Sequence, residues 1–120
     1  MQDKLGNTVD VHLDRGNHQY VICYPSEAAT TVAGLADFQD RDGTEGPERI
    51  FFHTEVGEEY GGRGLASLLI RQALLDTTSE GRRIVAVCPF VRSHLEKKGH
   101  NGAWREPTPD ELAEFDEDER

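Results

Sequence analysis

The segment ERIFFHTEVGEEYGGRGLASLLIRQALLDTTS, residues 48–79, carries the signals of a strand, a glycine-rich loop and a helix in that order. Residues 48–56 are rich in aromatic and β-branched side chains, which favour a strand. Successive side chains of a strand point to opposite faces, so strict alternation predicts two sets. One face is expected to carry Ile50, Phe52, Thr54 and Val56, and the other Phe51, His53 and Glu55. His53 and Glu55 are therefore expected on the same side of the sheet.

A helix is expected after the loop of residues 57–62. Apolar residues recur there at the spacing of one helix face, at Leu65, Leu68, Leu69, Ala73 and Leu74. This pattern predicts an amphipathic helix over residues 63–79. The short apolar run at residues 83–88 predicts a buried strand that Pro89 ends, and residues 90–98 favour a second helix ending at Gly99.

The residues before this segment indicate further strands. Alternation over residues 9–13 permits a short edge strand, and residues 18–24 predict a strand stopped by Pro25. Residues 30–39 predict the next strand, and the polar run 40–47 predicts a loop. A strand, helix and strand in sequence imply a right-handed crossover with parallel strands. The fold class is thus α/β (α+β), a mixed sheet in which an antiparallel hairpin precedes one βαβ unit and a C-terminal helix.

The length of the chain predicts one small domain, and its charge argues against some classes of partner. The chain has 120 residues, of which 36% are hydrophobic, and this suits one domain over residues 1–105. A formal net charge of −10 argues against a general affinity for nucleic acid or anionic membrane. Residues 106–120 contain eight acidic residues and one arginine, and we expect a disordered tail in which Leu112 and Phe115 can anchor a short helical turn.

The location expected for the chain is the cytoplasm. Its apolar runs are far shorter than the roughly 20 residues that cross a bilayer, and the N-terminus lacks the pattern of a secretory signal. Cys23 and Cys88 are accordingly expected to stay reduced.

The glycine-rich stretch of residues 61–66, GGRGLA, lies between the expected strand and helix. Free backbone N–H groups and the helix dipole attract an anion at such a position, and a pyrophosphate fits there. The alternative is a turn that only lets the helix pack closely on the sheet. The stretch has no Gly-Lys-Ser/Thr ending, and a single βαβ unit follows, so neither a Walker loop nor a dinucleotide fold is indicated.

These residues resemble the coenzyme A loop of the GNAT acetyltransferase superfamily, whose pattern is Arg or Gln, two residues, Gly, one residue, Gly or Ala. Gly64 and Ala66 match the last two positions, and Gly61 departs from the first. With His-Thr-Glu-Val at residues 53–56 and Cys-Pro-Phe-Val at residues 88–91, the chain is similar over residues 18–105 to the minimal, single-domain YjdJ-type branch.

The resemblance implies acetyl-CoA as cosubstrate and a set of site residues. His53 and Cys88 are implied at the acetyl site, with the strand end at Thr54, Glu55 and Val56 along the pantetheine arm. The loop amides implied at the pyrophosphate belong to Gly61, Gly62, Arg63, Gly64, Leu65, Ala66 and Ser67. Direct attack of an amine on acetyl-CoA is the reaction that the family implies.

Several roles remain open for these side chains. His53 can act as a general base near neutral pH or be a histidine hydrogen-bonded within the sheet. Cys88 can be an acyl-accepting nucleophile, a general acid for the departing thiolate, or a packed core residue. Arg63 can meet phosphate or solvent. Cys88, His94 and His100 match no standard zinc spacing, so no metal site is expected.

The sequence therefore favours an acetyl-CoA-dependent N-acetyltransferase with an unidentified amine acceptor. Larger family members carry two helices between their first and second strands, whereas only a short turn separates Tyr24 and Thr30 here. This implies an open acceptor cleft and an acceptor that can be macromolecular. The alternative is a noncatalytic acyl-CoA binding or sensing module whose acidic tail recruits a partner. A third hypothesis is a structural interaction domain without a cofactor.

Overall fold

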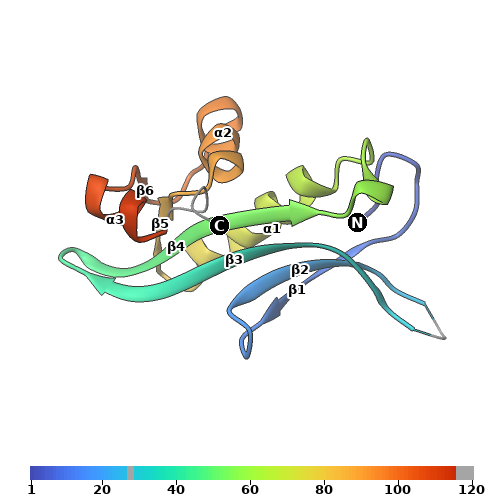
Figure 1. The fold of residues 1–120 in the computed structure, drawn as a ribbon, viewed down its shortest axis with the longest axis horizontal. Coiled ribbons are helices and arrows are strands. Elements are labelled where there is room, and N and C mark those ends of the chain that lie inside the picture. Colours follow the sequence, from blue (N-terminus) through green and yellow to red (C-terminus); the bar gives the residue numbers. More distant parts are fainter. Residues whose placement is uncertain (27–28, 116–120) are drawn as a thin grey trace.

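Six strands form one mixed sheet within residues 1–26 and 29–115, the part of the chain that the computed structural model describes (Figure 1). The strands are β1 Asp10–Asp14, β2 Gln19–Tyr24, β3 Thr31–Gly43, β4 Gly46–Val56, β5 Arg83–Ala86 and β6 Trp104–Arg105. They lie side by side in chain order. The first four are antiparallel, and β5 and β6 add parallel strands beside β4. The mixed sheet predicted from the sequence is confirmed.

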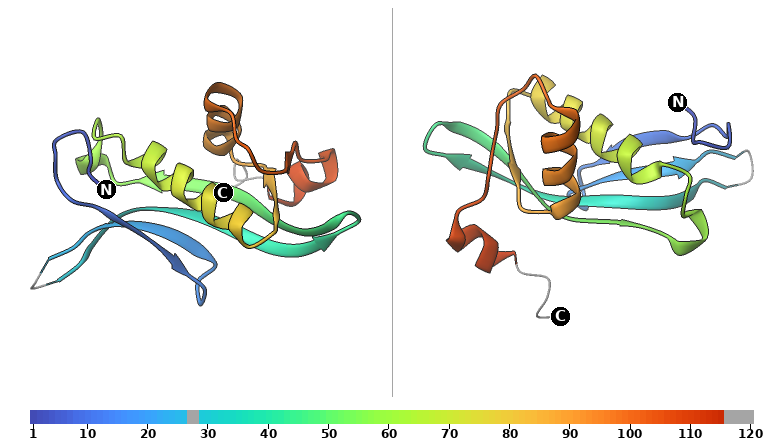
Figure 2. Two further views of the ribbon diagram at one scale, coloured as in Figure 1. Left: turned by 180° about the vertical axis from the view of Figure 1, so that it is seen from behind. Right: turned by 90° about the horizontal axis from the view of Figure 1, so that it is seen from above.

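Three α-helices connect or follow these strands in the described residues. They are α1 Leu65–Ser79, α2 Pro89–Lys98 and α3 Pro109–Glu114, and a short 3-10 helix, η1 Glu58–Tyr60, precedes α1. α1 packs on one face of the sheet with α2 beside it, and α3 lies on the opposite side of β4 (Figure 2). The expected βαβ unit is β4–α1–β5. A second parallel crossover, β5–α2–β6, was not predicted from the sequence.

The core lies between α1 and one face of the sheet. α1 presents side chains at helical spacing, and the sheet presents alternate residues of β2, β3 and β4. The buried members include Tyr20, Ile22, Ala36, Phe38 and Phe51 from the sheet, and Leu65, Leu69, Ile70, Ala73 and Leu74 from α1. The helix begins at Leu65 rather than at residue 63 because Gly64 has a φ of 75°, a left-handed conformation that glycine adopts without strain.

A β-bulge in β4 overturns the strict alternation expected for this strand. Phe38 pairs with Phe51 and Asp37 pairs with His53, so Phe52 is an extra residue in β4. Directly paired residues share a face of the sheet. Phe51 and Thr54 therefore both face α1, as their partners Phe38 and Ala36 do. His53 and Glu55 remain together on the other face, where His53 Nε2 lies 3.6 Å from Glu55 Oε2.

The loop predicted over residues 40–47 is mostly strand. β3 continues to Gly43 and β4 starts at Gly46, which leaves a turn at residues 44–45. Asp40 pairs with Arg49 in this register, and Arg41 pairs with Glu48. Asp40 and Arg49 form an ion pair across the two strands at 2.7 Å, so the polar composition that suggested a loop instead belongs to a long hairpin.

The C-terminal segment contains a short helix where the sequence allowed a helical turn at Leu112 and Phe115. Residues 109–114 form α3 within the stretch expected to be disordered, while residues 116–120 lie outside the described residues. Thr108 and Glu111 form a capping box, in which each side chain accepts a hydrogen bond from the backbone of the other. Arg105 bonds both Glu48 and Glu111, and Phe115 stacks on Phe52 at 4.9 Å. Local capping and ion pairs thus hold an acidic segment against the sheet.

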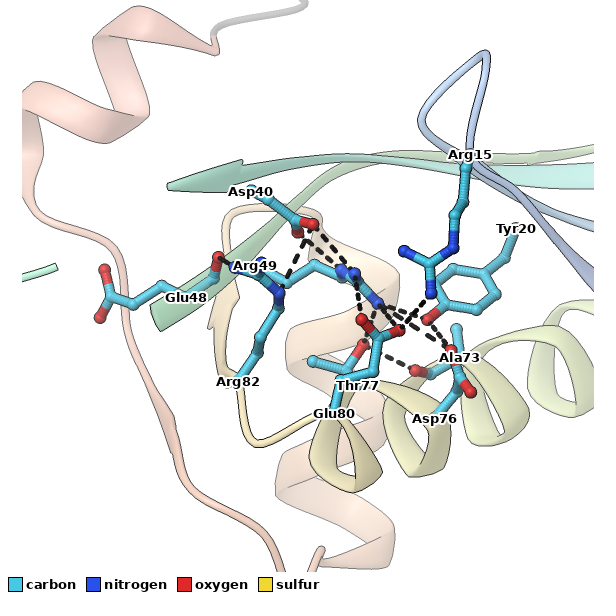
Figure 3. A network of polar contacts seen from close by, with 10 residues as sticks. All are labelled: Arg15, Tyr20, Asp40, Glu48, Arg49, Ala73, Asp76, Thr77, Glu80 and Arg82. Carbon is cyan, nitrogen blue, oxygen red and sulfur yellow. Dashed lines mark hydrogen bonds and ion pairs between the residues drawn. The ribbon is translucent and has the colours of Figure 1, made fainter. Parts of the chain in front are cut away.

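A buried arginine joins the C-terminal end of α1 to the sheet (Figure 3). The Arg49 side chain is fully buried and bonds Asp40 at 2.7 and 2.9 Å and Glu80 at 3.1 and 3.2 Å. It also donates to the Tyr20 hydroxyl and lies 4.4 Å from the Phe38 ring centroid. Burial alone lowers the pKa of Arg49, but the Asp40 and Glu80 carboxylates more than offset this and raise it. Arg49 is thus a fully paired core cation.

No helix among the described residues is long and apolar enough to span a membrane.

Candidate active site

The glycine loop forms a tight turn between η1 and α1. The N–H of Gly61 donates to the carbonyl of Glu58 at 3.1 Å and closes η1. Gly62 and Gly64 both adopt positive φ angles, 76° and 75°, which side chains disfavour. The carbonyl of Arg63 accepts a hydrogen bond from the Lys4 N–H at 3.0 Å, so the N-terminal segment holds the loop in place.

Backbone donors are open from Gly62 to the first turn of α1. The first backbone bond of the helix runs from the Leu68 N–H to the Gly64 carbonyl at 3.3 Å. Within residues 1–26 and 29–115, the N–H groups of residues 62–67 meet no hydrogen-bond acceptor, and no side chain caps the helix. The Gly61 N–H does not belong to this open set, because Glu58 already satisfies it. The six consecutive amides of residues 62–67 are therefore available to an anion.

The side chains around the loop are arranged differently from expectation. Arg63 lies over the rings of Tyr24 and Tyr60, at 5.5 and 5.3 Å from their centroids, and donates to the Tyr24 hydroxyl. Tyr24 in turn donates to the buried carboxylate of Asp3, and this bond lowers the pKa of Asp3. Arg63 therefore packs against aromatic rings.

Lys4 brings a positive charge to the loop from the other end of the chain. Its side chain crosses Gly64, with Cε 3.1 Å from where a Cβ on that glycine would lie. Asp3 holds the turn that presents Lys4 by accepting from the N–H groups of Leu5 and Asn7. Sequence reasoning missed Lys4, because nothing local in residues 1–8 links them to a loop so far along the chain.

The parallel strands β4 and β5 separate next to the loop. β5 pairs with β4 only as far as Phe51 and Ala86, and the Cys88 N–H then donates to the Phe51 carbonyl at 2.8 Å. β4 continues to Val56. The Gly57 N–H donates to the Ala33 carbonyl of β3. Successive residues of a strand direct their main-chain N–H and C=O groups to opposite neighbouring strands. The groups of Thr54 and Val56 therefore point away from β3, to the side where β5 no longer pairs. This edge can bond an extended ligand.

Cys88 and His53 lie on different faces of the sheet. The Cys88 thiol is buried among core residues and contacts Thr54 Oγ1 at 3.3 Å. Thr54 faces α1, whereas His53, its neighbour in β4, faces the opposite side with Glu55. The two candidate catalytic side chains therefore flank the free edge of β4 from opposite sides, and Thr54 is the direct partner of Cys88.

A hollow between α1 and α2 extends from the helix mouth. It has a volume of about 250 Å³ and is lined by Ala66, Ser67 and Ile70 of α1 and by Phe90, Ser93, His94, Lys97 and Lys98 of α2. Phe90 is 56% exposed and gives this hollow an apolar side. The hollow adjoins the mouth of α1, because Ala66 and Ser67 in the first turn of the helix line it.

The family model described as GCN5-related N-acetyl-transferase matches residues 23–103. The chain belongs to this family of N-acetyltransferases. Members transfer an acetyl group with acetyl-CoA as cosubstrate. The match spans the glycine loop, both parallel crossovers up to β6, and the segments around His53 and Cys88.

Solved structures of acetyltransferases share the fold. The chain is similar to the solution structure of a GCN5-like N-acetyltransferase from Staphylococcus aureus, with a TM-score of 0.57, 20% identity, and coverage of 83% of this chain and 91% of that one. It is also similar to a ribosomal-protein-alanine N-acetyltransferase from Brucella melitensis biovar Abortus 2308, with a TM-score of 0.52, 20% identity, and coverage of 81% and 74%. No curated protein matches the sequence significantly.

Proposed function

We propose that this acetyltransferase transfers the acetyl group of acetyl-CoA to a cationic amine and belongs to the minimal, YjdJ-type branch of the family. The observation that carries the proposal is the run of open N–H groups at residues 62–67 beside the free edge of β4. A diphosphate accepts hydrogen bonds from such amides and is favoured by the helix dipole. A pantetheine arm has the amides and carbonyls needed to pair with a strand edge.

Lys4 is the residue proposed to replace the Arg or Gln side chain that Gly61 lacks. The ammonium group lies at the end of a side chain already held across Gly64, and none of the described residues forms an ion pair with it. Arg63 is the less suitable cation, because its guanidinium is stacked on Tyr24 and Tyr60. A diphosphate at the loop would thus gain one positive charge from the N-terminal turn.

The chemistry is assigned to groups at the free edge of β4. Bound acetyl-CoA supplies an activated acetyl carbon, to which the amine nitrogen bonds as the carbon–sulfur bond breaks. The outward main-chain N–H groups of Thr54 and Val56 are suited to stabilise negative charge on the carbonyl oxygen. Cys88 is proposed to give a proton to the departing sulfur, with Thr54 orienting the thiol at 3.3 Å. His53 is proposed to accept the proton that the amine loses.

The face that carries His53 suits a positively charged acceptor. Asp37 pairs with His53 on this face, and Glu55 lies 3.6 Å from the imidazole. A hollow of about 300 Å³ at the end of β4 is lined by both Glu55 and Glu59, with Gly34 and Val56 between them. Carboxylates attract ammonium groups and repel anionic substrates, so amines are favoured as the acceptor class.

Release of the coenzyme A thiol in the presence of acetyl-CoA and a panel of amines tests this function. The panel includes polyamines, lysine peptides and N-terminal peptides, and the variants are Cys88→Ala, Cys88→Ser and His53→Ala. We expect turnover by the parent, with a loss in all three variants and binding of acetyl-CoA retained. Mass spectrometry of the parent after incubation with acetyl-CoA then separates an acetylated Cys88 from direct transfer. Binding without turnover across the panel would instead indicate an acyl-CoA binding module.

A further inference from the structure

The face of the sheet opposite α1, which we call the outer face, is partly covered along β4. Phe51 packs in the core under α1, so its neighbour Ile50 points to the outer face by alternation. Ile50 pairs with Val85 of β5, and both side chains are fully buried outside the core under α1. α3 lies on this side of β4 (Figure 2). A second, smaller buried layer therefore covers the first half of β4, and His53 and Glu55 follow beyond it.

Phe115, directly after α3, lies at the border of this covered region. Its ring stacks on the Phe52 ring, with 4.9 Å between the centroids and 20° between the planes. Phe52 is the first residue of β4 beyond the last pair with β5, which joins Phe51 to Ala86. Both rings are partly exposed. Phe115 therefore presents an accessible aromatic surface where β4 and β5 separate, and His53 is the next residue along β4.

Ion pairs fix the position of this aromatic surface. Arg41 of β3 donates to both carboxylate oxygens of Glu114, at 3.1 and 2.6 Å, and its guanidinium lies 5.6 Å from the centroid of the Phe115 ring. Arg105 donates to both carboxylate oxygens of Glu111 at 2.8 Å. Bidentate pairs of this kind fix orientation as well as distance. α3 is thus held to the sheet on both sides of the Phe115 ring.

α3 is an addition to the family domain. The family model ends at residue 103, whereas α3 begins at Pro109. Of the three α-helices described, α3 alone lies on the outer face, while α1 and α2 lie on the other side of the sheet (Figure 2). The helical cover of the outer face in the described residues therefore comes from a segment that the matched domain does not include.

We propose that α3 forms a side wall of the acceptor site and that Phe115 is a specificity-determining residue, which packs against the carbon chain that carries the acceptor amine. This inference rests on the proposed function, because the amine must approach the separated strands from the face of His53. The carboxylates of Asp37 and Glu55 attract the ammonium group. The rings of Phe115 and Phe52 offer an apolar surface to the chain behind it. Amines on an apolar chain are therefore favoured over amines on a polar one.

Steady-state kinetics of the full chain with hexylamine and 2-(2-aminoethoxy)ethanol test the wall. The two amines have chains of equal length, but the second carries two oxygen atoms in place of carbon. At saturating acetyl-CoA, we expect the parent to have a kcat/KM about tenfold or more higher for hexylamine, the size of effect that an apolar contact produces. Phe115→Ala should reduce this preference to about twofold by raising the KM for hexylamine, and the KM for acetyl-CoA should stay within about twofold of the parent.

Three further variants separate a wall from a general role in stability. Phe115→Leu keeps an apolar side chain and should retain most of the preference. Leu112→Ala removes a side chain of the same helix that is 45% exposed, and should leave the preference unchanged. Arg41→Gln breaks the ion pair with Glu114 and should weaken the preference in the parent but add nothing to Phe115→Ala, because it acts through the Phe115 ring. Thermal unfolding of each variant verifies that it is folded.

The outcomes distinguish this inference from the proposed function. An unchanged preference in Phe115→Ala, or turnover of peptides and polyamines by the parent without turnover of hexylamine, overturns the wall while the proposed function stands. A higher kcat/KM for both amines in Phe115→Ala shows that α3 blocks the site, and it also overturns the wall. No turnover of any amine by the parent overturns the proposed function and this inference with it.

Discussion

The two ends of α1 differ in what satisfies their polar groups. At the C-terminal end, the N–H groups of Glu80, Gly81 and Arg82 donate to carbonyls of the last turn. The carboxylate of Glu80 meets Arg49 inside the protein, and the Tyr20 hydroxyl donates to Asp76 beside it (Figure 3). At the N-terminal end, the amides of residues 62–67 are open and no side chain caps the helix.

This contrast separates groups that stabilise the fold from groups that are open to solvent or to a ligand. A buried cation whose carboxylates are all in place contributes to stability only as a complete set, because removing one member leaves the others unpaired. Amides left open at a helix mouth cost little in water, since the solvent bonds them. Substitutions at the C-terminal end of α1 should therefore change the free energy of unfolding, whereas substitutions at its N-terminal end should change the affinity for coenzyme A.

The largest effect is expected from Arg49→Ala. This change removes the buried cation that Asp40 and Glu80 share, leaves them only Arg82 and Arg15 at 3.5 Å, and removes the contact with the Phe38 ring. The free energy of unfolding should fall by about 3–5 kcal/mol. Urea denaturation followed by circular dichroism measures it. The matched control is Arg83→Ala, since Arg83 pairs with Glu45, whose side chain is 70% exposed, and such pairs contribute at most about 1 kcal/mol. An equal loss of unfolding free energy in the two variants would contradict the description of Arg49 as a fully paired core cation.

Ser67→Asp should separate stability from binding at the open end. A carboxylate in the first turn interacts favourably with the helix dipole and should raise the free energy of unfolding by about 0.3–1 kcal/mol. The same carboxylate would repel a diphosphate and should weaken coenzyme A binding about tenfold, or about 1.4 kcal/mol. Ser67→Asn, which has nearly the same size without the charge, should change neither by as much. Thermal unfolding and calorimetric titration of both variants provide the two readings, and a gain in affinity for Ser67→Asp would exclude an anion at this mouth.

Lys4→Ala should produce a smaller loss of affinity at the same end. One exposed charge contributes about 0.5–1 kcal/mol, so coenzyme A should bind about threefold more weakly while stability stays nearly unchanged. Lys4→Arg keeps the charge over Gly64 and should restore the affinity. Competition binding with a fluorescent coenzyme A derivative resolves a change of this size. If Lys4→Ala binds as tightly as the parent at low salt, the charge at the loop must come from another residue.

Local patterns in the sequence are enough to predict most of the fold. The spacing of Leu65, Leu69 and Leu74 identifies α1 because one face of a helix must be apolar to pack on a sheet. The bulge at Phe52 could not be predicted in this way, because its extra residue is apolar and fits either face. The long hairpin was missed for a related reason, since Asp40 and Arg49 look like loop residues until their pairing across the strands is known.

The candidate site also has a part that local sequence patterns predict and a part that depends on distant contacts. The glycine loop could be predicted from its motif and from its place between a strand and a helix, and its amides from residue 62 onward are open. The position of Lys4 depends on a contact between distant parts of the chain, for which no local signal exists. His94 and Lys98 are four residues apart, so the sequence could predict that they share a helix face. It could not predict that Arg71 of α1 lines a hollow with both of them.

The smallest effect is expected from Glu111→Gln, in a second ion-pair cluster where Arg105 bonds Glu48 and Glu111. The hydrogen bond from Arg105 is the main cause that lowers the pKa of Glu111 to about 2 from an ordinary 4.5. A carboxylate with a depressed pKa contributes stability above its unfolded pKa and loses that contribution as the pH falls from about 4.5 toward 2. Glu111→Gln keeps an acceptor for the Thr108 N–H but removes the charge, so it should be less stable than the parent at pH 6. The difference should shrink at pH 3.5 and below in urea titrations. If Glu111→Gln lowers the free energy of unfolding equally at pH 6 and pH 3, Glu111 acts only as a neutral helix cap. In that case its ion pair with Arg105 does not stabilise the packing of α3 on the sheet.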